Sequence, residues 1–214
     1  MRLYLSSYKL GNQPNRLVQL FGKGARVAVI YNACDFSEDP IVRGKYLEVQ
    51  LQMLRDVGFE PTEIDLREYF GGKNDLNGTL RKFHAIWVPG GNVFILRRAM
   101  KQSGFDQVIK ELLSKDVLAY GGFSAGACVT TPTLKGIDIM DHPDVIPKGY
   151  ESEIVWDGLN LVDYSIVPHF DSDHPEVELA GKAVEYFKKN NLPHHVLRDG
   201  EVILIDGSSS EFLN

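Results

Sequence analysis

The chain has 214 residues and a formal net charge of −6, with 43% hydrophobic and 24% charged residues. This length fits a single domain with a large core, and the negative charge disfavours nucleic acid and anionic membranes as partners. No apolar stretch is long enough to span a membrane and the first residues lack a signal-peptide core, so we expect a cytoplasmic protein whose two cysteines, Cys34 and Cys128, stay unpaired.

Short apolar runs alternate with amphipathic stretches along the chain. The runs predict strands, and the helical spacing of apolar residues between several of them predicts helices. One helix face is expected to contain Tyr46, Val49, Met53 and Leu54. This alternation predicts an α/β three-layer sandwich with a mainly parallel central sheet. The predicted strands cover residues 2–6, 25–31, 61–66, 85–89, 117–121, 165–168, 196–197 and 202–205.

Three stretches depart from this alternation. Residues 130–158 show no firm period, and we expect a long loop with short strands close to the functional site. Residues 198–201 read Arg-Asp-Gly-Glu, which is typical of a tight hairpin turn. Residues 208–214 are expected to form a disordered tail after a single domain of residues 1–207.

The segment Gly-Gly-Phe-Ser-Ala-Gly-Ala at 121–127 places Ser124 between a predicted strand and a predicted helix. Small residues on both sides allow the sharp turn of a nucleophile elbow, which lifts a serine clear of the sheet. A simpler interpretation is that Ser124 only caps the helix. A nucleophilic serine needs a base, and of the six histidines His169 is best placed, because it directly follows the strand at 165–168.

An oxyanion hole needs two backbone N–H groups that point to one spot. Ala125, which follows the candidate nucleophile, would provide one of them, and Gly91 could provide the other. Gly90 and Asn92 flank Gly91 and are candidate substrate-binding residues. The alternative is an ordinary turn in which Asn92 caps the next helix.

Three motifs occur in an order that resembles the S51 peptidases: Pro-Gly-Gly-Asn-Val-Phe at 89–94, Gly-Phe-Ser-Ala-Gly-Ala at 122–127 and Pro-His-Phe at 168–170. That family includes dipeptidase E (α-aspartyl dipeptidase) and cyanophycinase, and its fold is similar to class I glutamine amidotransferases, which are flavodoxin-like. The resemblance covers roughly residues 25–205. It implies a serine peptidase with Ser124 as nucleophile, His169 as general base, and Gly91 and Ala125 as the oxyanion hole.

Two carboxylates compete for the third place in the triad. Leu-Arg-Asp-Gly at 197–200 resembles the Leu-Pro-Glu-Gly segment that carries the acid of dipeptidase E, with Asp199 in place of glutamate. Asp171 instead has the spacing from His169 at which the amidotransferase relatives place their acid. We expect Asp199 first and Asp171 second.

Two other classes of function stay open. The cluster His169, Asp171, Asp173 and His174 could ligate a divalent metal in a metal-dependent hydrolase. The chain could also be a non-catalytic binding module with an amidotransferase-like fold, in which case the acid would be absent or misplaced. For the serine peptidase we expect no cofactor, a small peptide as substrate, and a monomer or homodimer.

The resemblance is weakest where it concerns the substrate. Dipeptidase E uses basic side chains after its catalytic histidine to pair with the substrate's aspartate, and bidentate arginine suits that group. Between residues 169 and 196 this chain has three lysines and no arginine. N-terminal Asp-Xaa specificity is therefore in doubt, and four arginines elsewhere are possible substitutes: Arg43, Arg97, Arg98 and Arg198.

Overall fold

The structure is a computed structural model that describes residues 1–37 and 39–214. Its strands are β1 (Arg2–Ser6), β2 (Arg26–Val29), β3 (Glu60–Glu63), β4 (Ala85–Val88), β5 (Ala119–Phe123), β6 (Ser165–Val167), β7 (His194–Val196), β8 (Val202–Asp206) and β9 (Ser209–Leu213). Its α-helices are α1 (Pro14–Phe21), α2 (Pro40–Asp56), α3 (Leu76–Leu80), α4 (Val93–Gln102), α5 (Phe105–Ser114), α6 (Ala125–Cys128) and α7 (Val177–Lys189). Three 3₁₀ segments lie between them: η1 (Asn32–Cys34), η2 (Leu66–Gly72) and η3 (Ile137–Ile139).

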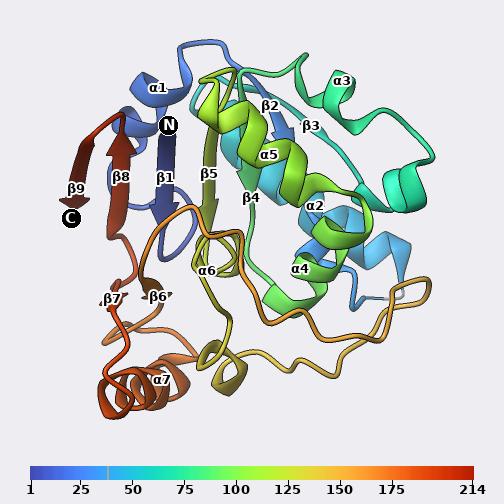
Figure 1. Ribbon diagram of the computed structural model, residues 1–214. Coiled ribbons are helices and arrows are strands. Elements are labelled where there is room, and N and C mark those ends of the chain that lie inside the picture. The colour runs from blue at the N-terminus through green and yellow to red at the C-terminus, as the bar shows by residue number, and fades with distance from the viewer. Residues whose placement is uncertain (38) are drawn as a thin grey trace.

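Seven strands form the central sheet in the order β3-β2-β4-β5-β1-β8-β9 (Figure 1). The first five are parallel to one another, while β8 runs antiparallel to β1 and β9 antiparallel to β8. The parallel strands therefore end at one edge of the sheet, which is where α/β proteins place their ligands. The predicted mainly parallel sheet is confirmed.

Side chains alternate between the two faces of this sheet. In β1, Leu3 and Leu5 pack into one core, which α4 and α5 cover, while Tyr4 packs into a second core, which α1 helps to cover. In β4 the same alternation sends Ile86 and Trp87 to opposite faces. All of these side chains are fully buried, so the period of two residues fixes the register of the sheet. The fold is the three-layer sandwich expected from the sequence. No helix among the described residues is both long enough and apolar enough to cross a membrane.

The turn from β5 into α6 packs tightly against the end of β4. A Cβ atom added to Gly126 would lie 2.0 Å from the carbonyl oxygen of Val88, and one added to Gly122 would lie 2.7 Å from the same oxygen. These are backbone contacts, which cannot move aside as a flexible side chain could. The glycines around Ser124 are therefore required by the close approach of the helix to the sheet.

We expect Gly126→Ala to lower the free energy of unfolding by about 3 kcal/mol, because the added methyl group overlaps the backbone of β4. Urea unfolding followed by circular dichroism measures the change. Gly181→Ala in α7 is the matched control: nothing lies within 4 Å of its added Cβ, so it should stabilise the helix by about 0.5–1 kcal/mol. An unfolding midpoint of Gly126→Ala equal to that of the wild type would contradict the close approach.

The strand before His169 does not join the central sheet. β6 pairs with β7 in a separate parallel two-stranded sheet, and α7 packs beside both strands. Figure 1 shows this small unit below the carboxyl ends of the central strands, next to α6. His169 was expected at the end of a strand within the central sheet. It instead follows a strand of the separate two-stranded sheet.

Two predictions near the carboxyl end are wrong. Residues 198–201 do not close a hairpin, because β7 before them pairs with β6 while β8 after them pairs with β1. Residues 208–214 are not a disordered tail, since Ser209–Leu213 forms β9 against β8. The hairpin is one turn later, where Gly207 has a φ of 61° between β8 and β9. The Asp-Gly pair at 206–207, rather than the one at 199–200, makes the hairpin turn.

The expected apolar face of α2 is also only partly buried. Leu54 is fully buried, but Tyr46 is 63% and Val49 59% exposed. The buried contacts of this helix are near its carboxyl end, where Leu54 meets the second core, so the apolar residues nearer its start lie on the surface. The helical spacing predicted the helix correctly, but only some of the residues on the predicted face are buried.

Candidate active site

Ser124 lies at the sharp turn between β5 and α6. Its φ of 50° and ψ of −116° are unusual for a residue with a side chain, and strain of this kind is typical of functional turns. Its N–H group is held by the carbonyl oxygens of Ser6 and Ser7 at the end of β1. The side chain makes no capping hydrogen bond to α6. The hydroxyl group is therefore directed away from the helix, and the interpretation of Ser124 as a simple N-cap is not supported.

His169 contacts Ser124 with one ring nitrogen and a carboxylate with the other. Its Nε2 is 3.1 Å from Ser124 Oγ, and its Nδ1 is 2.7 Å from Asp199 Oδ1. With Nδ1–H donating to the carboxylate, Nε2 is left as the acceptor for the serine hydroxyl. The His169 side chain is only 2% exposed, so the three groups form a chain of hydrogen bonds that is largely shielded from water.

Ser7, which directly follows β1, holds both His169 and Asp199. Its hydroxyl donates to Asp199 Oδ1 at 2.8 Å and accepts the backbone N–H of His169, also at 2.8 Å. The N–H of Asp199 in turn donates to Ser172 Oγ at 2.8 Å. Ser7 is fully buried. Ser7 was not predicted from the sequence, in which only its place directly after a strand sets it apart.

Asp171 does not reach His169. Its carboxylate pairs with Arg198, and both side chains are about 60% exposed, at 63% and 59%. The backbone explains this direction, because His169 and Asp171 both have positive φ values, 61° and 48°. The chain turns between them, so a spacing of two residues does not put both side chains on one side. Of the two candidate acids, the structure brings only Asp199 to the histidine.

The backbone N–H groups of Gly91 and Ala125 are both available at the site. Neither donates a hydrogen bond to any residue among 1–37 and 39–214. Gly91 has a φ of 140°, and a Cβ atom on it would lie 2.6 Å from the carbonyl oxygen of Ala33, so only glycine fits there. Gly91 lines the same pocket as Ser124. Because Ala125 directly follows Ser124 and Gly91 lines the same pocket, both N–H groups stay candidates for an oxyanion hole.

The neighbours of Gly91 have mainly structural contacts. Asn92 Oδ1 caps α4 by accepting the N–H groups of Phe94 and Ile95, and its Nδ2 donates to the carbonyl of His142. Its amide is thus engaged on both sides, as the N-cap alternative expected. Gly90 packs against the Cβ of Ser124 and accepts a hydrogen bond from the thiol of Cys34. Both residues line the pocket, but Asn92 has little capacity left for a substrate.

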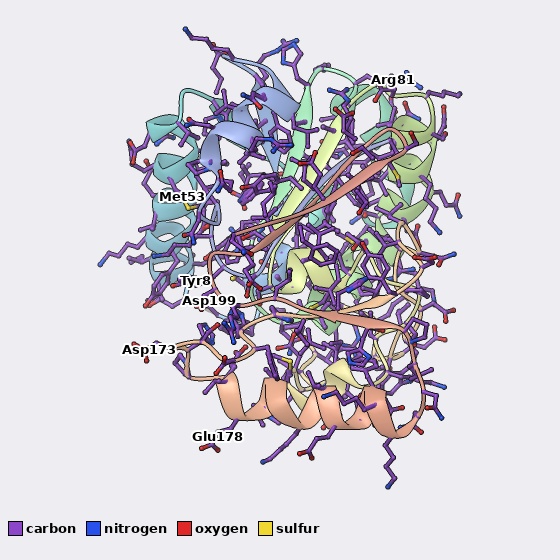
Figure 2. All side chains as sticks on the ribbon, turned by 90° about the vertical axis from the view of Figure 1, so that its left-hand side faces the viewer. Tyr8, Met53, Arg81, Asp173, Glu178 and Asp199 are labelled. Carbon is purple, nitrogen blue, oxygen red and sulfur yellow. The ribbon has the colours of Figure 1, made fainter. Side chains whose placement is uncertain are left out.

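The residues of the expected metal cluster do not converge. Asp171 pairs with Arg198, and Asp173 is exposed on the outer side of its loop (Figure 2). His174 instead stacks on His169, with ring centroids 3.6 Å apart and planes 7° apart. Glu176 joins these two histidines in a group whose ligand atoms lie within 4.8 Å of one another. Two of the four expected ligands, Asp171 and Asp173, are thus directed away from this group.

A pocket of about 410 Å³ opens in front of Ser124. Tyr8 lines it, and its ring centroid is 6.0 Å from that of His169. None of the four arginines considered as substitutes lines it. Each has another partner: Arg43 pairs with Asp35 and Glu63, Arg97 with Asp106, Arg198 with Asp171, and Arg98 donates to the carbonyls of Pro143, Val145 and Glu153. The long loop at 130–158, which Arg98 anchors, contributes part of the pocket wall.

The environment of His169 keeps its ring neutral. Burial lowers the pKa of His169 below its ordinary value, and the neighbouring His174 lowers it further, while the hydrogen bond and charge of Asp199 act in the opposite direction. A general base must be unprotonated to accept a proton, so a lowered pKa extends its working range toward acid.

We therefore expect the acid limb of kcat/KM for peptide hydrolysis to fall below pH 6.5, the ordinary histidine value. Activity should be fully present above the pKa of His169 and should be lost as the pH falls through it. Rates measured between pH 4 and 8 on an uncharged substrate would test this. An acid limb at or above pH 6.5 would contradict the effect of burial.

A strained serine at a strand-to-helix turn, hydrogen-bonded to a buried histidine, places the chain in the class of α/β proteins with a nucleophile elbow. A sequence model described as Peptidase family S51 matches residues 8–213. The chain belongs to peptidase family S51, a family of serine peptidases.

Individual relatives agree with this assignment. The chain is 34% identical over 160 residues to an uncharacterized peptidase from Listeria innocua, which covers 75% of this chain and 72% of that one. It is 30% identical over 146 residues to a Drosophila melanogaster protein named a probable alpha-aspartyl dipeptidase, covering 66% and 58%. A crystal structure of a Listeria monocytogenes protein, described as a candidate peptidase E, superimposes with a TM-score of 0.80 at 28% identity, over 99% of this chain and 97% of that chain.

Proposed function

We propose that the chain hydrolyses short peptides with Ser124 as nucleophile, His169 as general base and Asp199 as the acid of the triad. One observation carries the proposal: the buried ring of His169 joins the serine hydroxyl through Nε2 and the Asp199 carboxylate through Nδ1. In this geometry the carboxylate fixes the tautomer that leaves Nε2 free to accept a proton. Ser7 is a positioning residue, since it ties Asp199 to the backbone of His169.

The first half of the reaction forms an acyl-enzyme. Ser124 Oγ attacks the carbonyl carbon of the scissile peptide bond while its proton passes to His169 Nε2. The carbonyl oxygen becomes an oxyanion, which the N–H groups of Gly91 and Ala125 stabilise. The C–N bond then breaks, and the leaving amine takes the proton from His169.

The second half releases the acid product. A water molecule gives a proton to His169 Nε2 and attacks the ester carbon, and the second oxyanion is stabilised by the same two N–H groups. Breaking the bond to Ser124 Oγ returns the proton from His169 to the serine. The reaction needs no group from outside the chain besides water.

The positions of His169, Asp171 and Asp173 argue against the two alternative functions. A binding module has no need for an aligned acid, yet Asp199 Oδ1 is 2.7 Å from Nδ1. A metal-dependent hydrolase built on the expected cluster would need Asp171 and Asp173 beside His169, but Asp171 pairs with Arg198 and Asp173 is exposed.

A dipeptide library, with acidic, neutral and basic first residues, tests the proposal. We expect hydrolysis that a serine-directed phosphonate abolishes and that a chelator leaves unchanged. Loss of activity with the chelator, its return with zinc, and no effect of the phosphonate would instead establish the metal-dependent alternative.

A further inference from the structure

Among the described residues, two carboxylates but no lysine or arginine line the pocket in front of Ser124. Asp141, from the long loop at 130–158, and Glu176, at the start of α7, both line it. None of its described lining residues is a lysine or an arginine. A substrate that carries a carboxylate on its first side chain would place a third negative charge in this pocket. A cationic group would complement it.

Neither carboxylate forms an ion pair with a lysine or an arginine among the described residues. Asp141 Oδ2 accepts only the N–H of Val93 at 2.8 Å. Glu176 Oε2 lies 3.9 Å from Nε2 of His169, whose lowered pKa favours a neutral ring. Burial, together with the negative charge of Glu176, raises the pKa of Asp141 to about 7. The pocket thus contains two carboxyl groups that no lysine or arginine of the described lining neutralises.

Glu176 lies close to the proposed catalytic pair of Ser124 and His169. Its carboxylate lies 3.9 Å from the same His169 nitrogen that is 3.1 Å from Ser124 Oγ. In a peptide, the α-amino nitrogen is about 2.5 Å from the first carbonyl carbon, and the second carbonyl is one residue, or about 3.8 Å, further along. An amine bound to Glu176 would therefore lie close enough to Ser124 for the first carbonyl of the peptide to reach the serine hydroxyl.

Four apolar side chains also contribute to the wall of the pocket, beside its histidines: Phe36, Phe123, Met140 and Val145. They come from three separate segments of the chain, because Met140 and Val145 both belong to the long loop at 130–158. Burying an apolar side chain against such a wall is favourable, whereas burying an unpaired carboxylate there is costly.

We propose that Glu176, together with Asp141, binds the α-ammonium group of the substrate's first residue, and that this residue has an apolar side chain and not that of aspartate. The inference rests on the proposed function, because it assumes that Ser124 attacks the bond. It makes the chain an amino-terminal exopeptidase for short peptides with an apolar first residue.

Matched dipeptides separate the charges involved. Leu-Leu carries the free amine, N-acetyl-Leu-Leu lacks it, and Asp-Leu adds a carboxylate. We expect the wild type to have a kcat/KM for Leu-Leu at least tenfold higher than for either of the others. Glu176→Gln should lower kcat/KM for Leu-Leu about tenfold, mainly through KM, as expected for the loss of one charge-assisted hydrogen bond. Its effect on N-acetyl-Leu-Leu should be much smaller.

Glu178→Gln is the matched control. Glu178 is on the same helix but is exposed and points away from the pocket, as Figure 2 shows, so this variant should keep the wild-type preference. A wild type that prefers Asp-Leu, or a Glu176→Gln variant that loses equal activity on free and acetylated peptides, would overturn the inference.

Labelling of Ser124 by a phosphonate separates this inference from the proposed function. If Ser124 is labelled while the preferences are reversed, the amine site is wrong and the nucleophile stands. If Ser124 is not labelled and no peptide is cleaved, the proposed function fails and the amine site fails with it.

Discussion

Ser124→Ala is expected to reduce kcat/KM for the best dipeptide by about 10⁴-fold or more, because removing a triad nucleophile leaves only the contribution of binding and the oxyanion hole. The fold should persist. Alanine adopts the same backbone conformation at the turn, and the loss of one hydrogen bond to His169 costs only about 1 kcal/mol.

Two measurements on the same preparation test this result. Hydrolysis assays report the loss of activity, and thermal unfolding reports whether the fold has survived. A Ser124→Ala variant that is folded and hydrolyses the dipeptide as fast as the wild type would rule out the serine as nucleophile.

Asp199→Asn is expected to lower kcat by about 10³–10⁴-fold with little change in KM, because an amide cannot hold the histidine in the required tautomer. Asparagine keeps the size of the side chain. It presents an N–H group where the carboxylate now accepts hydrogen bonds from both His169 and Ser7.

Asp171→Asn is the matched control for this substitution. The Asp171 carboxylate pairs with Arg198 on the surface, where ion pairs contribute at most about 1 kcal/mol to stability, so kcat should change by no more than a few fold. A large loss with Asp171→Asn together with a small one with Asp199→Asn would reverse the assignment of the acid.

The elements and residues that the sequence predicted well depend on short segments of chain. The turn at Ser124 could be predicted because strand, glycines and serine are adjacent, and the sheet could be predicted because buried parallel strands are nearly continuous apolar runs. The order of the strands depends on how the connecting helices cross the sheet. No short segment of the sequence carries that information.

Residues that act across long distances in the sequence were harder to find. Ser7 contacts His169, which is 162 positions away, and nothing near Ser7 in the chain indicates that contact. The choice between Asp199 and Asp171 depended on the path of the loop after β6, where positive φ values turn Asp171 outward. Glu176 was not predicted as part of the pocket, and His174 was expected only as a member of the alternative metal cluster.

The most direct test of Ser124 as the nucleophile is the mass of the protein after reaction with a serine-directed phosphonate, followed by peptide mapping. We predict one adduct per chain, located on Ser124, formed in step with the loss of peptidase activity, and much slower in the Asp199→Asn variant. Complete loss of activity without an adduct, or an adduct on another serine, would contradict the triad of Ser124, His169 and Asp199.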